Sequence, residues 1–98
     1  MALKDDASLL ILTSLAGGAK HGYAMIEDIR SITGARLGPG TLYGAIARLE
    51  ADGMIIALES DDRRRPYEIT PAGRRRLETE ISGMKGLVAV GLRRLRNT

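Results

Sequence analysis

Three side chains along one predicted helix are the clearest candidates for chemistry in this sequence: the hydroxyls of Thr41 and Tyr43 and the guanidinium of Arg48. Hydroxyl and guanidinium groups donate hydrogen bonds to phosphate oxygens, as do the free N–H groups of a helix's first turn. An arginine can also bind guanine in a major groove. These residue types are suited to noncovalent contact with DNA, and the alternative is a solvated helix face on which Tyr43 packs sideways.

A second basic cluster is the run Arg63, Arg64 and Arg65, at a turn expected between two strands. On a hairpin, these guanidinium groups would meet phosphates or enter a minor groove. The alternative is a soluble turn whose charge is neutralised by Asp61 and Asp62, which precede the run. We expect the arginines to bind DNA.

Lys20 and His21 precede another predicted helix, so they could approach a phosphate at its N-terminus. A single histidine is weak support for any function, and this contact stays open against a purely structural role. Gly22 and Tyr23, which follow, are expected to serve packing.

The composition argues against an enzyme. One histidine and no cysteine leave no ordinary zinc site and no Cys–His nucleophile, and the glycines near Lys20 lack the spacing of a phosphate-binding loop. We expect no cofactor and no bound metal. No apolar run approaches the roughly 20 residues that span a membrane, and a cytosolic location fits the absence of cysteine.

The helix that carries Thr41 and Arg48 is expected to begin at Pro39 and to end near Gly53, which can adopt a left-handed conformation. Helical spacing turns one apolar face inward and leaves Thr41, Gly44 and Arg48 outside. The inward residues are Leu42, Ile46 and Leu49. An apolar run over residues 54–58 then predicts a strand.

Two earlier helices complete the predicted core. The first runs from about Asp6 to Ala16, with Asp5 or Asp6 as its cap, and is almost wholly apolar. The second runs from about His21 to Thr33 and stops at Gly34. Its expected inward residues are Met25, Ile26, Ile29 and Ile32.

A long helix is predicted from Pro71, capped by Thr70, to about Arg96. Its apolar residues alternate in steps of four and three, which is typical of a coiled coil. No intramolecular partner is expected to cover them, so we predict dimerisation with a second copy. These residues are Leu77, Ile81, Met84, Val88 and Leu95.

Five sequence blocks between Leu9 and Leu77 resemble the PadR family of winged-helix transcriptional repressors: H-G-Y, P-G-T-L-Y, R-L-E-x-D-G-x-I, a basic turn, and Y-x-I-T-x-A-G. The resemblance implies a DNA-binding homodimer that occludes a promoter and is released by a small-molecule effector. Some members hold flat drugs between tryptophans, but this chain has no tryptophan. That kind of drug binding is not expected here, although a cavity lined by Leu and Met is not excluded.

The charge distribution supports a rival interpretation. The net charge is +3, yet residues 1–80 sum to −1 and residues 81–98 to +4. Any affinity for DNA must therefore come from local clusters. The alternative is a winged-helix module that binds proteins and not DNA.

We therefore expect a mainly α protein with a small β-hairpin. Residues 1–70 would form a winged helix-turn-helix domain and residues 71–98 a long C-terminal dimerisation helix. The expected partner is double-stranded DNA with a pseudo-palindromic operator.

Overall fold

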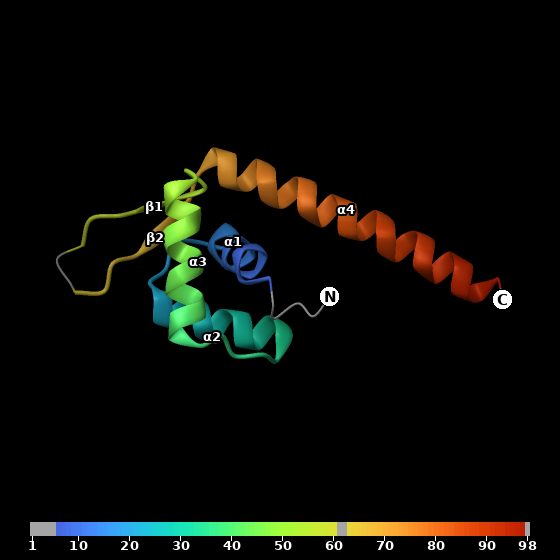
Figure 1. Ribbon diagram of the computed structural model, residues 1–98, viewed down its shortest axis with the longest axis horizontal. Coiled ribbons are helices and arrows are strands. Elements are labelled where there is room, and N and C mark those ends of the chain that lie inside the picture. Colours follow the sequence, from blue (N-terminus) through green and yellow to red (C-terminus); the bar gives the residue numbers. More distant parts are fainter. Residues whose placement is uncertain (1–5, 61–62, 98) are drawn as a thin grey trace.

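The computed structural model describes residues 6–60 and 63–97, and the mainly helical fold with one small hairpin is confirmed. α4 extends away from the other elements on one side, and the β1–β2 loop projects on the other (Figure 1). The elements are α1 (Ala7–Ala16), α2 (Gly22–Thr33), α3 (Pro39–Ala51), β1 (Ile55–Ala57), β2 (Tyr67–Ile69) and α4 (Pro71–Arg96).

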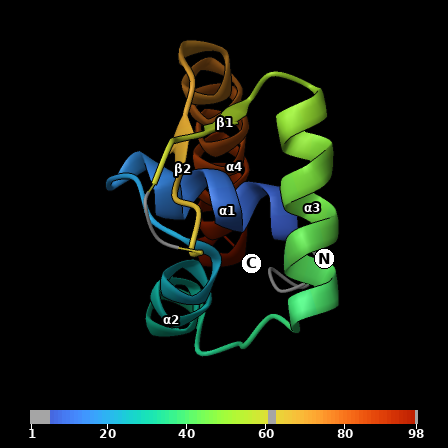
Figure 2. The same ribbon diagram turned by 90° about the vertical axis from the view of Figure 1, so that its left-hand side faces the viewer.

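The first helix, α1, is the centre of the core. Its N-cap is Asp6, whose carboxylate accepts a hydrogen bond from the Leu9 N–H at 3.1 Å. Asp5, the alternative cap, lies outside the described residues. α1 contacts α2, α3, α4 and β2, and Figure 2 shows it crossing the middle of the molecule. This placement explains why its leucines and isoleucine leave almost no polar face.

The second helix, α2, is capped by His21 and ends at Gly34, whose φ of 75° is left-handed. Met25, Ile26 and Ile29 are buried as predicted, but the inward position predicted for Ile32 is wrong, because this side chain is 53% exposed. Ile32 lies in the last turn of α2, which the neighbouring elements leave open to solvent. Periodicity identifies a face of a helix but not where along the helix the core stops.

The third helix and the hairpin follow the prediction closely. The predicted inward residues of α3 are all buried, and Gly53 has a left-handed φ of 74° just after the helix. β1 and β2 pair antiparallel, with Ile55 opposite Ile69 and Ala57 opposite Tyr67. Ile55 and Ile69 are buried, so the hairpin adds one apolar face to the core and leaves its loop projecting.

The long helix α4 begins as predicted, with Pro71 in its first turn and the Thr70 hydroxyl accepting from the Gly73 N–H at 3.1 Å. The expectation that no intramolecular partner covers its apolar residues is wrong for Leu77, which is buried in the core, and for Met84, which packs against it. Ile81, which lies between these two, is exposed, and so are Leu87 and several apolar side chains farther along α4. Four of the exposed apolar residues recur at a spacing that places them on one helix face. We call them the α4 stripe: Ile81, Val88, Leu92 and Leu95.

The glycines of α4 do not interrupt it, since the helix is continuous to Arg96. None of the helices in the described ranges is long and apolar enough to cross a membrane.

Candidate nucleic-acid interface

Three separate segments of the chain meet around one surface groove of about 360 Å³. All three tyrosines line it, and they are the chain's entire complement of Phe, Trp and Tyr. We call it the tyrosine groove, and its lining residues are His21, Gly22, Tyr23, Tyr43, Arg63, Arg64, Arg65 and Tyr67. It combines guanidinium, phenol and imidazole groups, all of which can bind an anionic, partly aromatic polymer.

Tyr43 connects α3 to the tyrosine groove. Its side chain is 51% exposed, and its ring lies against the backbone of Gly22 at the first turn of α2. A Cβ atom added at Gly22 would lie only 2.8 Å from Cζ of Tyr43. Sideways packing of Tyr43 and contact with DNA are therefore compatible, because one side of the ring packs on Gly22 while the other remains exposed to solvent.

The outward face of α3 carries Thr41 and Arg48, both exposed, with the small residues Gly40 and Ala47 between and beside them. No side chain caps the N-terminus of α3, where Gly38 is the N-cap. The first-turn N–H groups next to Thr41 thus lack an intrahelical partner and can bind an anion. Thr41 and Arg48 do not line the tyrosine groove.

The loop between β1 and β2 presents Arg63, Arg64 and Arg65, all exposed. A hydrogen bond of 2.9 Å from the Leu58 N–H to the Pro66 carbonyl closes the base of this loop. The loop is therefore the wing of a winged helix. Asp61 and Asp62, which would neutralise the arginines in the alternative interpretation, lie outside the described residues.

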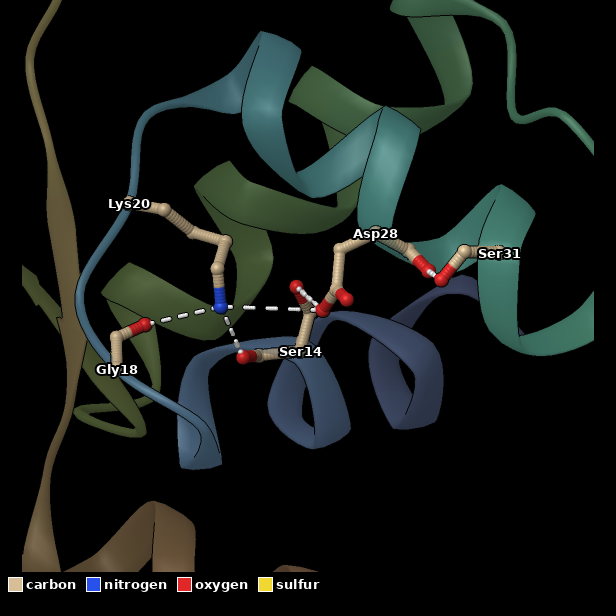
Figure 3. A network of polar contacts seen from close by, with 5 residues as sticks. All are labelled: Ser14, Gly18, Lys20, Asp28 and Ser31. Atoms are coloured by element: carbon tan, nitrogen blue, oxygen red, sulfur yellow. Dashed lines mark hydrogen bonds and ion pairs between the residues drawn. The ribbon is translucent and has the colours of Figure 1, made fainter.

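Lys20 and His21, which were both predicted to approach a phosphate before α2, have different surroundings in the structure. The imidazole of His21 lines the tyrosine groove while its Nδ1 accepts from the Ala24 N–H at 3.4 Å, as the cap of α2. The ammonium of Lys20 turns the other way, toward the end of α1 and toward Asp28 (Figure 3). Its side chain is only 21% exposed. We therefore leave Lys20 out of the candidate interface.

Sequence reasoning assigned Tyr23 to packing and did not consider Tyr67. Tyr23 is 58% exposed and lines the tyrosine groove, whereas Gly22 beside it does serve packing. For Tyr67 a signal was present, because it follows the arginine run by two residues and begins the second strand of the hairpin. Tyr43 is itself a candidate binding residue, and each of the other two tyrosines lies two residues from one, which is the signal in the sequence that the three meet.

Comparison with known proteins gives consistent results. A family model described as "Transcriptional regulator PadR-like family" matches residues 11–79. An uncharacterized 37.1 kDa protein in transposon TN4556 of Streptomyces fradiae is 51% identical over 85% of this chain, and the match covers 24% of that protein. The chain thus spans about a quarter of that relative's length.

Transcriptional regulator Rv3488 of Mycobacterium tuberculosis is 39% identical over 81% of this chain and 76% of its own length. Among solved structures, a transcriptional regulator from Clostridium thermocellum superposes with a TM-score of 0.79 at 30% identity, covering 90% of this chain and 88% of that one.

Proposed function

The chain belongs to the PadR-like family of transcriptional regulators, and on that premise we propose that it is a homodimeric, DNA-binding repressor. The observation that carries this proposal is the tyrosine groove. It brings Tyr43 of α3 together with the wing arginines on one surface. A recognition helix and a wing on the same surface can follow one DNA duplex together.

In this proposal, α3 enters a major groove with its outward face. Thr41 and the uncapped N–H groups beside it bind a phosphate, and Arg48 binds either a phosphate or a guanine. The absence of large side chains at Gly40, Gly44 and Ala47 allows a close approach. The face offers few groups that read bases, so DNA shape would supply part of the specificity.

The wing would bind the same duplex beside the recognition helix. Arg63, Arg64 and Arg65 would contact phosphates or the minor groove, and the tyrosine hydroxyls and His21 would donate to the backbone that passes along the tyrosine groove. Residues 1–80 are nearly neutral overall, which favours a module that binds proteins. The local concentration of positive charge on the wing would allow DNA binding in spite of that overall neutrality.

The proposed dimer forms through the C-terminal region, residues 71–98. The α4 stripe exposes large apolar side chains along a helix that extends beyond the core, and a second copy would bury them. Leu77 and Met84 pack in or against the core of their own chain. They would therefore hold α4 in place while the α4 stripe contacts the second copy. A two-fold dimer would present its recognition helices to half-sites about 10 bp apart, or a multiple of that.

Repression would follow from occlusion of a promoter, and a small-molecule effector would release the dimer. The packing offers a route for such coupling, because α1 contacts both α4 and α3. A ligand that changes the packing of α4 would thereby move the recognition helix through α1.

The proposal is tested by fluorescence anisotropy on two labelled duplexes, one from the DNA upstream of the protein's own gene and one scrambled. Both are titrated at about 50 and 200 mM salt, a range over which phosphate contacts weaken binding steeply. We expect tighter binding to the upstream duplex and a salt-dependent affinity for both. No binding to either duplex would favour the alternative, a winged-helix module that binds proteins.

A further inference from the structure

A polar network joins the end of α1, the α1–α2 connection and α2 (Figure 3). The ammonium of Lys20 donates to the Ser14 carbonyl and, at 3.1 Å, to the Gly18 carbonyl, and it lies 3.8 Å from Oδ2 of Asp28. The hydroxyl of Ser14 donates to the same Oδ2 at 2.6 Å. Ser14 is the one polar residue buried among those described, at 1% exposed.

This arrangement suits the end of a helix. The Ser14 carbonyl near the end of α1 accepts from the Gly17 N–H at 3.2 Å and has room for a second donor, and a helix C-terminus carries partial negative charge. The ammonium of Lys20 provides both a donor and a positive charge there, while Asp28 draws it toward α2. A lysine held by three groups from different segments fixes the course of the connection between them.

The backbone of the same residue pairs with the wing. The Lys20 N–H donates to the Tyr67 carbonyl at 3.2 Å, and the Tyr67 N–H donates to the Lys20 carbonyl at 3.1 Å. Lys20 thereby acts as a short third strand beside β2. Its neighbour His21 and Tyr67 both line the tyrosine groove.

We propose that Lys20 is a positioning residue of the DNA interface, which sets the separation between the wing and the N-terminus of α2 without touching DNA itself. This inference rests on the proposed function. The side chain of Lys20 fixes the α1–α2 connection against α1 and α2. The backbone hydrogen bonds of Lys20 then fix Tyr67, and with it the wing, relative to that connection. Loss of the ammonium frees the α1–α2 connection, so His21 and Tyr67 no longer keep a fixed spacing in the tyrosine groove.

The first test replaces the ammonium and keeps the aliphatic stem, in Lys20→Met. Arg30→Met is the matched control, because it also removes one positive charge, from an exposed side chain of α2 that does not line the tyrosine groove. We expect Lys20→Met to weaken DNA binding by about 2- to 30-fold, the range in which residues away from a site modulate it. The log–log salt slope should stay unchanged. A slope smaller by about 0.9 would mean that Lys20 contacts a phosphate and would overturn the proposal. Unchanged affinity would overturn it as well.

A second test asks whether the effect passes through the wing. In a chain that already carries Arg63→Ala, Arg64→Ala and Arg65→Ala, the change Lys20→Met should cost little further affinity. An equal loss in both backgrounds would show that Lys20 acts independently of the wing. If Lys20→Met does not fold, as judged by circular dichroism, Asp28→Asn removes one partner of the ammonium and should show the same pattern more weakly.

The closing experiment needs no DNA. Hydrogen exchange of the Tyr67 amide, which donates to Lys20, should be faster in Lys20→Met, while the amides of α3 exchange at the wild-type rate. Unchanged exchange at Tyr67 would overturn the positioning role whether or not the chain binds DNA. If the wild-type chain binds no DNA but the Tyr67 amide still responds, the proposed function fails and the role of Lys20 in positioning the wing stands.

Discussion

The ring of Tyr43 lies on the backbone of Gly22, so closely that a single Cβ atom at Gly22 would displace it. This contact joins the proposed recognition helix α3 to the first turn of α2 in the lining of the tyrosine groove. It also explains why a tyrosine that is half exposed has a defined position: one side of its ring rests on a residue with no side chain.

Gly22→Ala is therefore expected to weaken DNA binding by about 1 kcal/mol, the order of one contact, without unfolding the chain. Alanine is compatible with a helix, so thermal stability should not fall. In a Tyr43→Ala background the same change should have no further effect, because the displaced ring is gone. An equal loss in both backgrounds, measured by anisotropy, would show that Gly22 acts by another route.

The wing arginines are expected to contribute charge and not sequence preference. Replacing Arg63, Arg64 and Arg65 with alanine should weaken binding to specific and random duplexes alike. Each lost phosphate contact should reduce the magnitude of the log–log salt slope by about 0.9. An unchanged affinity and slope would mean that the wing does not touch DNA.

Dimerisation should depend on the α4 stripe. The double change Val88→Glu and Leu92→Glu places charges where an apolar partner surface is proposed, and analytical ultracentrifugation should then detect a monomer. Ser82→Glu with Ala89→Glu adds the same charge at exposed positions away from the stripe and should leave the dimer intact. A dimer that survives the first pair of changes would place the interface elsewhere.

Two glycines of α4 should respond in opposite directions to alanine. A Cβ atom at Gly73 would lie 2.8 Å from Cγ1 of Ile69 and closer still to the Met54 carbonyl, so Gly73→Ala should destabilise the fold by about 1–3 kcal/mol. Gly86 has open space around it, and Gly86→Ala should raise stability by up to about 1 kcal/mol. Urea denaturation of both variants checks the pair. Equal effects of the two changes on the free energy of unfolding would show that Gly73 of α4 does not pack against Met54.

Sequence reasoning works well here for local structure. Caps and breakers such as Asp6, Gly34 and Thr70 act within a few residues of themselves, so these residue types mark helix ends that the structure confirms. The inward face of α3 is also a local property, because it follows from helical spacing alone.

Sequence reasoning fails where the answer depends on residues far along the chain. Periodicity assigns Ile32 and Leu77 to apolar faces, but only the packed fold shows that the first is exposed and the second is in the core. Similarly, the charge of Lys20 suggests a phosphate contact until its partners Ser14 and Asp28 are brought next to it. The meeting of Tyr23 and Tyr67 depends on the fold in the same way.

The central claim is that the outward face of α3 recognises DNA, and one variant tests it most directly: Thr41→Ala, Tyr43→Phe and Arg48→Ala combined. A competition titration measures its affinity for a duplex selected by the wild-type protein against a random duplex, with folding checked by circular dichroism. We predict that the variant loses its preference for the selected duplex, with Arg48→Ala alone costing about 1–3 kcal/mol if the arginine reads a base. Full affinity and full preference in the folded triple variant would contradict the account.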